Sequence, residues 1–80
     1  MMSNVIPRQK LLDKAKSGKV GTEEERTQAL LRSGVELAKG RQEESVVFAQ
    51  FGLGVSLEEA RKTIDLVVAE FTTRRMRDEI

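Results

Sequence analysis

The segment FGLGVSLEEARKTI, residues 51–64, decides the fold, because it holds a change of chain direction followed by the start of a helix. Two glycines precede Ser56, and Glu59 follows it three positions later. A serine and a glutamate at this spacing form a capping box, in which both side chains satisfy free N–H groups at a helix start. Val55 stands where a hydrophobic staple would contact Ala60. The segment therefore predicts a corner between two helices.

A regular apolar stripe follows this corner, in a helix predicted over residues 56–77. Its members are spaced 3, 4, 3 and 4 residues apart, which is typical of packed helices, and they are Leu57, Ala60, Ile64, Val67 and Phe71. Phe48 and Phe51 precede the corner. Together with Val46 and Val47, these seven residues give more apolar surface than one hairpin needs, and such an excess can mark a partner surface. We therefore predict that they form an interface with another copy or with a partner.

The preceding stretch, TEEERTQALLRSGVELAKG (22–40), also predicts a helix. Thr22 and Glu25 form a second capping box, and the glutamates of the first turn suit the positive end of the helix dipole. Its apolar and small residues fall on one broad face, which comprises Leu30, Leu31, Gly34, Val35, Leu37 and Ala38. This face is the expected buried face of the helix.

The polar segment KGRQEES (39–45) leaves the length of this helix open. The helix either breaks at Gly40 or continues to residue 51. At 100° per residue, Phe48 and Ala49 return to the face of the earlier leucines, which is consistent with one continuous helix. Such a helix would be about 45 Å long and would require an elongated hairpin.

A shorter helix is expected over residues 6–17, where Pro7 suits the first turn and Gly18 the end. The sequence thus predicts an all-α fold of three helices near 6–17, 22–51 and 56–77. We expect one small domain spanning 1–80, with a basic N-terminal helix and linker over 1–21. Residues 22–80 would form an antiparallel helical hairpin, completed by oligomerisation.

Composition favours oligomerisation and argues against catalysis. A chain of 80 residues buries only somewhat over roughly 60% of its unfolded surface, so a monomer would be marginally stable. Small proteins compensate with disulfides, metals or oligomerisation. The sequence has no cysteine and no histidine, which removes disulfides, thiolate ligands and the commonest general base. We expect no catalytic residues, no metal and no cofactor. No window approaches a membrane-spanning length of about 20 apolar residues, so a cytoplasmic protein without membrane contact is expected.

Charge is unevenly distributed, although the net charge is only +1. Residues 1–21 carry five basic and one acidic side chain, whereas residues 22–59 carry four basic and eight acidic ones. A basic segment of this kind suits an anionic partner or the acidic surface of a neighbouring subunit. The candidate contacts are Arg8, Lys10, Lys14, Lys16 and Lys19, together with Arg61 and Lys62.

The corner also has features of a DNA-reading helix-turn-helix, with Gly52–Thr63 as the turn and the start of the reading helix. Two observations argue against this interpretation. The loop is one residue longer than the tight turn, and Glu58 and Glu59 would face phosphates. A plain corner of a helical hairpin is therefore favoured.

Residues 11–37, LLDKAKSGKVGTEEERTQALLRSGVEL, resemble the helix–turn–helix portion of ParD-type ribbon-helix-helix antitoxins. In that family a helix ends in a Ser-Gly-Lys/Arg-x-Gly turn before a capped helix, which matches Ser17–Thr22. The resemblance covers about a third of the chain and implies a dimeric DNA-binding repressor whose C-terminal region binds a toxin. The family's N-terminal strand has only SNVI before Pro7 as its counterpart.

Taken together, the sequence predicts a small non-catalytic helical protein that acts by protein–protein interaction, as a regulatory or adaptor homo-oligomer. The partner is expected to be a second copy or another protein. The alternative is a DNA-binding repressor or antitoxin-like regulator that uses the basic N-terminal segment or the Gly52–Thr63 region.

Overall fold

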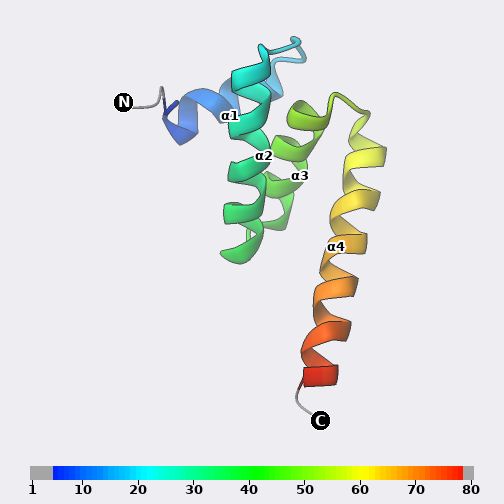
Figure 1. The fold of residues 1–80 in the computed structure, drawn as a ribbon. Helices are drawn as coiled ribbons and strands as arrows, with labels where there is room; N and C mark the ends of the chain where they lie inside the picture. Colours follow the sequence, from blue (N-terminus) through cyan, green and yellow to red (C-terminus); the bar gives the residue numbers. More distant parts are fainter. Residues whose placement is uncertain (1–4, 79–80) are drawn as a thin grey trace.

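The computed structural model describes residues 5–78 of the chain, with side chains up to residue 75, and is all-helical. Its helices are α1 (Arg8–Lys16), α2 (Glu23–Ala38), α3 (Gln42–Leu53) and α4 (Leu57–Asp78) (Figure 1). The expected all-α class is confirmed. The expected count of three helices is wrong, because the segment 22–51 forms two helices. Of the two alternatives left open for this segment, the break at Gly40 is the one observed.

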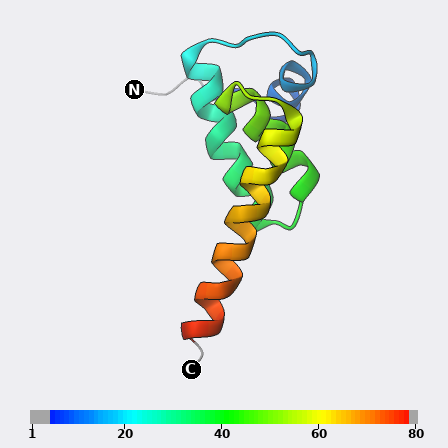
Figure 2. The same cartoon turned by 90° about the vertical axis from the view of Figure 1, so that its right-hand side faces the viewer.

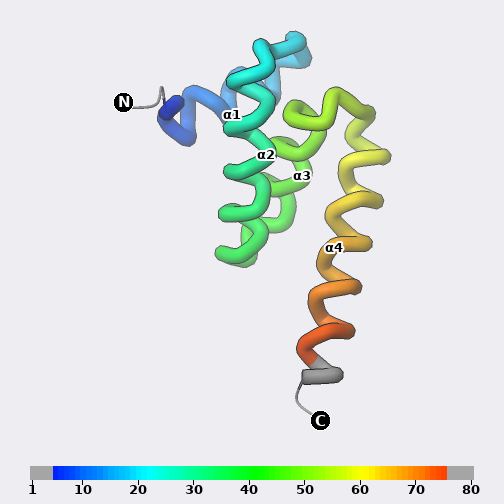
Figure 3. The backbone as a smooth tube through the Cα atoms, viewed as in Figure 1, coloured from blue at the N-terminus to red at the C-terminus, as the bar shows by residue number. Residues whose placement is uncertain are grey.

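The break falls at Gly40, which has a φ of +80°. In this left-handed conformation the chain leaves the helix at little cost, because glycine has no Cβ. The amide of Arg41 donates back to the carbonyl of Glu36 at 2.9 Å, which closes the end of α2. The tube in Figure 3 shows the reversal that results. The matching helical phase before and after Gly40 therefore did not reflect a continuous helix.

α2 and α3 form an antiparallel pair held close by small residues (Figure 1). The hydroxyl of Ser33 donates to the carbonyl of Ser45 at 2.8 Å, and the hydroxyl of Ser45 donates to the carbonyl of Ser33 at 2.9 Å. At the other end Gly52 lies against α2, where an added Cβ would stand 2.9 Å from the Arg26 carbonyl oxygen. The two helices therefore approach closely near both ends of their contact.

The buried face of α2 differs from the expected one. Its buried residues are Ala29, Ser33 and Glu36, whereas Leu31 is 69% exposed. The close approach of α3 requires small side chains such as Ala29 and Ser33 at the contact. Glu36 is buried for a different reason, because its carboxylate accepts two hydrogen bonds from Arg8. The expected apolar face of α2 therefore lies largely at the surface.

Two apolar clusters form the core, one on each side of α3. The first joins α1 to α2 and α3, and comprises Leu11, Leu12, Ala15, Ala29, Phe48 and Phe51. The second joins α3 to α4, and comprises Val46, Ala49, Ala60 and Ile64, with Leu37, Val55 and Val68 packed against it. The core thus depends on α3, which contacts all three other helices.

Both predicted helix starts are present. The hydroxyl of Thr22 accepts the amide of Glu25 at 3.1 Å, and the Glu25 carboxylate accepts the amide of Thr22 at 2.8 Å. The hydroxyl of Ser56 accepts the amide of Glu59 at 3.1 Å, and Val55 packs against the cluster that contains Ala60. The predicted corner therefore joins α3 to an antiparallel α4.

α4 is longer than the helix it packs on, as the turned view in Figure 2 shows. The molecule measures 43 × 33 × 18 Å along its principal axes. Within the described residues, the backbone of α4 lies close to that of α3, but not to that of α1 or α2. The far end of α4 is consequently left without a neighbouring helix.

Candidate functional site

The two halves of α4 lie in different surroundings. Ala60 and Ile64 are buried against α3. The side chain of Gln42, the first residue of α3, donates to Asp65 at 3.0 Å, so α3 begins at the level of Asp65. Residues 66–78, here called the α4 overhang, extend past that level by about 20 Å at 1.5 Å per residue.

The α4 overhang exposes large apolar side chains. Leu66 is 70% exposed, Phe71 65% and Val67 43%. The segment also contains Val68, Thr72 and Thr73, and β-branched residues favour helix less than unbranched ones do. A short helix of this composition is marginal in water without packing. The overhang is therefore a helical segment whose own sequence stabilises it weakly and whose apolar face is uncovered.

An open groove of about 490 Å³ runs between the overhang and the end of α2. On the α4 side it is lined by Val67, Val68 and Phe71, with Thr72 and Arg75 beyond them. On the other side lie Gly34, Leu37 and Ala38 of α2, followed by Gly40 and Gln42. The walls are thus mainly apolar, and the α2 wall is made of small residues with one leucine.

The seven residues predicted as an interface separate into two groups. Phe48 and Phe51 lie in the first core cluster, and Ala60 and Ile64 lie in the second, so these four stabilise the fold. Leu57, Val67 and Phe71 are exposed, the last two beside the groove.

The α2 wall of the groove was not predicted as a site. Gly34 and Ala38 had been assigned to the apolar face of a longer helix, and only the break at Gly40 places them opposite the overhang. Gly40 itself was the one feature of the sequence that indicated this break.

Three of the predicted basic contact residues are engaged within the molecule. Arg8 donates from Nε and Nη2 to the two carboxylate oxygens of Glu36, each at 3.0 Å. Lys14 pairs with Glu25 at 3.1 Å, and Arg61 pairs with Glu43 at 2.7 Å. These ion pairs join α1 to α2 and α3 to α4.

The ion pair on Glu36 is unusual, because the Glu36 side chain is fully buried. The hydrogen bonds from Arg8, aided by Arg41 at 3.4 Å, lower the pKa of Glu36 to about 2 despite the opposing effect of burial. The same contact raises the pKa of Arg8. The carboxylate is therefore charged at neutral pH, and it ties α1 and the α2–α3 turn together.

The remaining predicted basic residues are exposed but are not gathered into one patch. Lys10 and Lys16 lie on α1, Lys19 follows in the linker, and Lys62 lies on α4. In the described part of the chain, the backbones of α1 and α4 do not lie close to each other. The structure therefore brings the two basic groups to different parts of the molecule.

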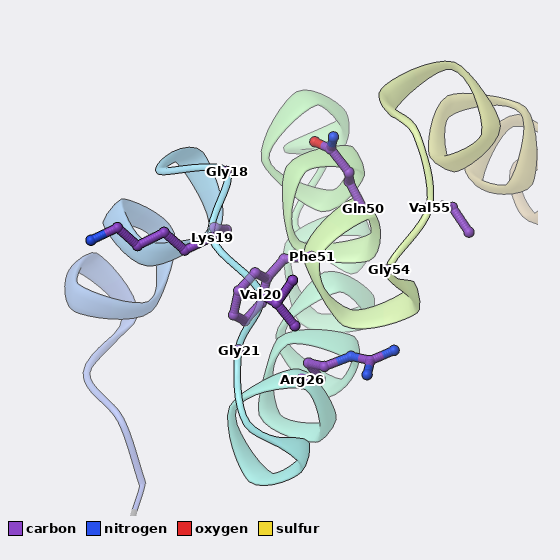
Figure 4. A pocket seen from close by; sticks show the side chains of 10 residues that line it. Gly18, Lys19, Val20, Gly21, Arg26, Gln50, Phe51, Gly54 and Val55 are labelled. Carbon is purple, nitrogen blue, oxygen red and sulfur yellow. The ribbon is translucent and has the colours of Figure 1, made fainter.

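A second depression lies beside the linker between α1 and α2 (Figure 4). Gly21 lies so close to the Phe51 ring that a side chain there would not fit. Figure 4 shows the side chains of Lys19 and Arg26 extending in opposite directions, and Nε of Arg26 donates to the carbonyl of Gly52 at 3.3 Å. The depression therefore has no converging charges that would hold a ligand.

Within residues 5–78, no group of three or more carboxylates is close enough together to hold a metal ion. None of the described helices combines the length and apolar character needed to cross a bilayer.

Comparison of the chain with models of protein families, with curated proteins and with solved structures gives no match. The site must therefore be interpreted from its own geometry, in which the α4 overhang and its groove are the most distinctive surface.

Proposed function

We propose that this protein is a non-catalytic helical interaction protein, which acts as a regulator or adaptor by binding a polypeptide through the α4 overhang and the adjoining groove. The single observation that supports this function most is the uncovered apolar face of the overhang, with Phe71 65% exposed beside a groove of about 490 Å³. A helical partner in the groove would remove this face from water and would also stabilise a helix of weak propensity.

The groove suits a peptide chain better than a small molecule. Its walls are open and apolar, and the small residues Gly34 and Ala38 leave room along α2. Recognition of a helix by an apolar groove uses side chains spaced three and four residues apart. The α4 wall presents such a spacing in Val67, Val68 and Phe71.

The proposal is tested by photo-crosslinking in the cells that make the protein. A photoreactive amino acid at Phe71 should give a covalent protein adduct, because the partner would cover this position. The matched control is the same amino acid at Leu31, which is as exposed, at 69%, but lies on α2 outside the groove. An absence of adducts from Phe71, or the same adducts from both positions, would contradict the proposal.

Duplex DNA serves as the competing ligand. We expect no tight binding at low salt, because Arg8 and Lys14 are engaged with Glu36 and Glu25. The exposed lysines that remain are not gathered into one patch. Binding that weakens steeply as salt rises would instead favour the DNA-binding repressor.

A further inference from the structure

We propose a second interaction surface, on the outer face of α2, which binds an acidic amphipathic helix of another protein. This surface is separate from the groove beside the α4 overhang. Leu31 and Val35 belong to the apolar face that the sequence predicted to be buried, and the structure leaves both exposed. The surface is here called the α2 outer face, and it comprises Val5, Leu31, Arg32, Val35 and Lys39.

The apolar side chains of the α2 outer face line a hollow of about 330 Å³. Leu31 and Val35 stand one turn apart along α2, and Val5 and Ile6 border the hollow from the segment before α1. Leu31 is 69% exposed and Val5 68%. Apolar side chains at this spacing form a ridge that packs against a second helix. The hollow suits the convex side of a helix, whereas a lipid surface is flat.

Positive charge without an acidic partner borders this hollow. Arg32 lines the hollow, and Lys39 follows seven residues later on the same edge of α2. Within the described residues, neither side chain forms an ion pair with a carboxylate, and no carboxylate lines the hollow. Two cations about two turns apart complement carboxylates at the same spacing on a partner helix.

The surrounding chain carries the same sign of charge. Residues 26–42 contain four basic side chains and one acidic side chain. The acidic one is Glu36, which is fully buried and already paired with Arg8 and Arg41. The other carboxylates of α2 lie in its first turn, about two turns before Leu31. The second half of the α2 outer face therefore attracts an acidic partner.

The apolar and the basic residues together select the kind of partner. The phosphates of a nucleic acid would pair with Arg32 and Lys39, but would leave Leu31 in water. A neutral apolar helix would cover Leu31, but would withdraw Arg32 from water without supplying an opposite charge, which costs free energy. A helix with carboxylates beside an apolar stripe satisfies both groups of residues.

The first experiment selects binders from a library of displayed helical peptides, with the full chain as bait. Each peptide carries a fixed stripe of leucines, and the positions beside the stripe are Glu or Lys at equal frequency. Peptides are assigned to the α2 outer face when Leu31→Asp abolishes their binding, and we expect them to be rich in Glu. Leu66→Asp is the matched control, because Leu66 is 70% exposed but lies outside the hollow and the groove. It should leave their binding unchanged.

The second experiment reverses the charge of the α2 outer face. Arg32→Glu combined with Lys39→Glu should weaken a selected acidic peptide by about tenfold or more, because two attractive pairs become repulsive. The same double variant should select peptides rich in Lys from the library. Lys16→Glu combined with Lys62→Glu is the matched control, since it changes the net charge equally at two exposed positions away from the hollow. It should retain the preference for Glu, and circular dichroism shows whether each variant keeps its helices.

The outcomes separate this inference from the function proposed for the groove. A library that yields no peptide dependent on Leu31, or yields peptides without an excess of Glu, overturns the inference. An unchanged preference in the Arg32→Glu, Lys39→Glu variant also overturns it. A photoreactive amino acid at Leu31 should capture a protein different from the one captured at Phe71, and the charge reversal should abolish only the capture at Leu31. An adduct at Phe71 with none at Leu31 contradicts the second surface and leaves the function of the groove intact.

Discussion

The substitution of Gly52 by alanine tests the close packing of α2 on α3. Gly52 lies inside α3, where alanine normally stabilises a helix by about 0.5–1 kcal/mol relative to glycine. Here the added Cβ would stand 2.6 Å from Leu30 Cγ and 2.9 Å from the carbonyl oxygen of Arg26. Leu30 has a side chain that can move, but the carbonyl belongs to the backbone of α2, so the helices themselves must separate.

Overpacking of this kind costs about 1–3 kcal/mol, which exceeds the gain in helix propensity. We therefore expect Gly52→Ala to lower the free energy of unfolding by about 1–2 kcal/mol. Gly34→Ala is the matched control, because Gly34 is also inside a helix but has no atom within 4 Å of the added Cβ. It should raise the free energy of unfolding by about 0.5–1 kcal/mol.

The assay is urea denaturation followed by circular dichroism, in which the midpoint reports stability and the slope reports surface exposed. Each variant is measured at two protein concentrations, because Gly34 lines the groove and an association equilibrium would make the midpoint depend on concentration. A Gly52→Ala protein as stable as the original chain would refute the argument. So would equal shifts for the two alanine variants.

Two buried polar contacts give further expectations. The pKa of Glu36 is lowered from 4.5 to about 2, so its contribution to stability is full above pH 4.5 and is lost as the pH falls towards 2. Thermal melts of Glu36→Gln should show a smaller loss across this window, and a loss equal to that of the original chain would contradict the assignment. Arg8→Ala should lower the free energy of unfolding in urea melts at pH 7, because it leaves the buried Glu36 carboxylate with only the longer contact to Arg41. A change within error would show that the pair is unimportant. Ser45→Ala should cost about 1–2 kcal/mol. Adding Ser33→Ala should cost less than a second independent loss, because the hydrogen bond between the two hydroxyls, 2.9 Å long, can be lost only once. Additive losses in the double-mutant cycle would show that the serines act separately.

Local signals in the sequence predicted the helix starts well. Thr22 with Glu25 and Ser56 with Glu59 lie at the starts of α2 and α4. The prediction succeeded because a cap depends on side chains and amides only three residues apart. The end of α2 was harder, because Gly40 adopts a left-handed conformation while the helical phase happens to continue beyond it.

The sequence predicted the buried faces less well. Hydrophobic periodicity assigned Leu30 and Leu31 to the interior of α2, yet Ser33 and Glu36 are buried there. Periodicity treats polar residues as facing water. The two serines satisfy each other across the α2–α3 contact, and Arg8 from another helix satisfies Glu36. Such partners are distant in sequence, so no local pattern reveals them.

The sequence by itself determined that the chain is helical, where α2 and α4 begin, and that α4 carries an apolar stripe. These properties depend on residues within a turn or two of one another. Only the tertiary structure decided which part of the stripe is free. The turn at Gly40 makes α3 begin at the level of Asp65. α3 therefore covers Ala60 and Ile64 but does not extend alongside Val67 and Phe71. Exposure depends on where neighbouring helices end, which is a property of the packed chain as a whole.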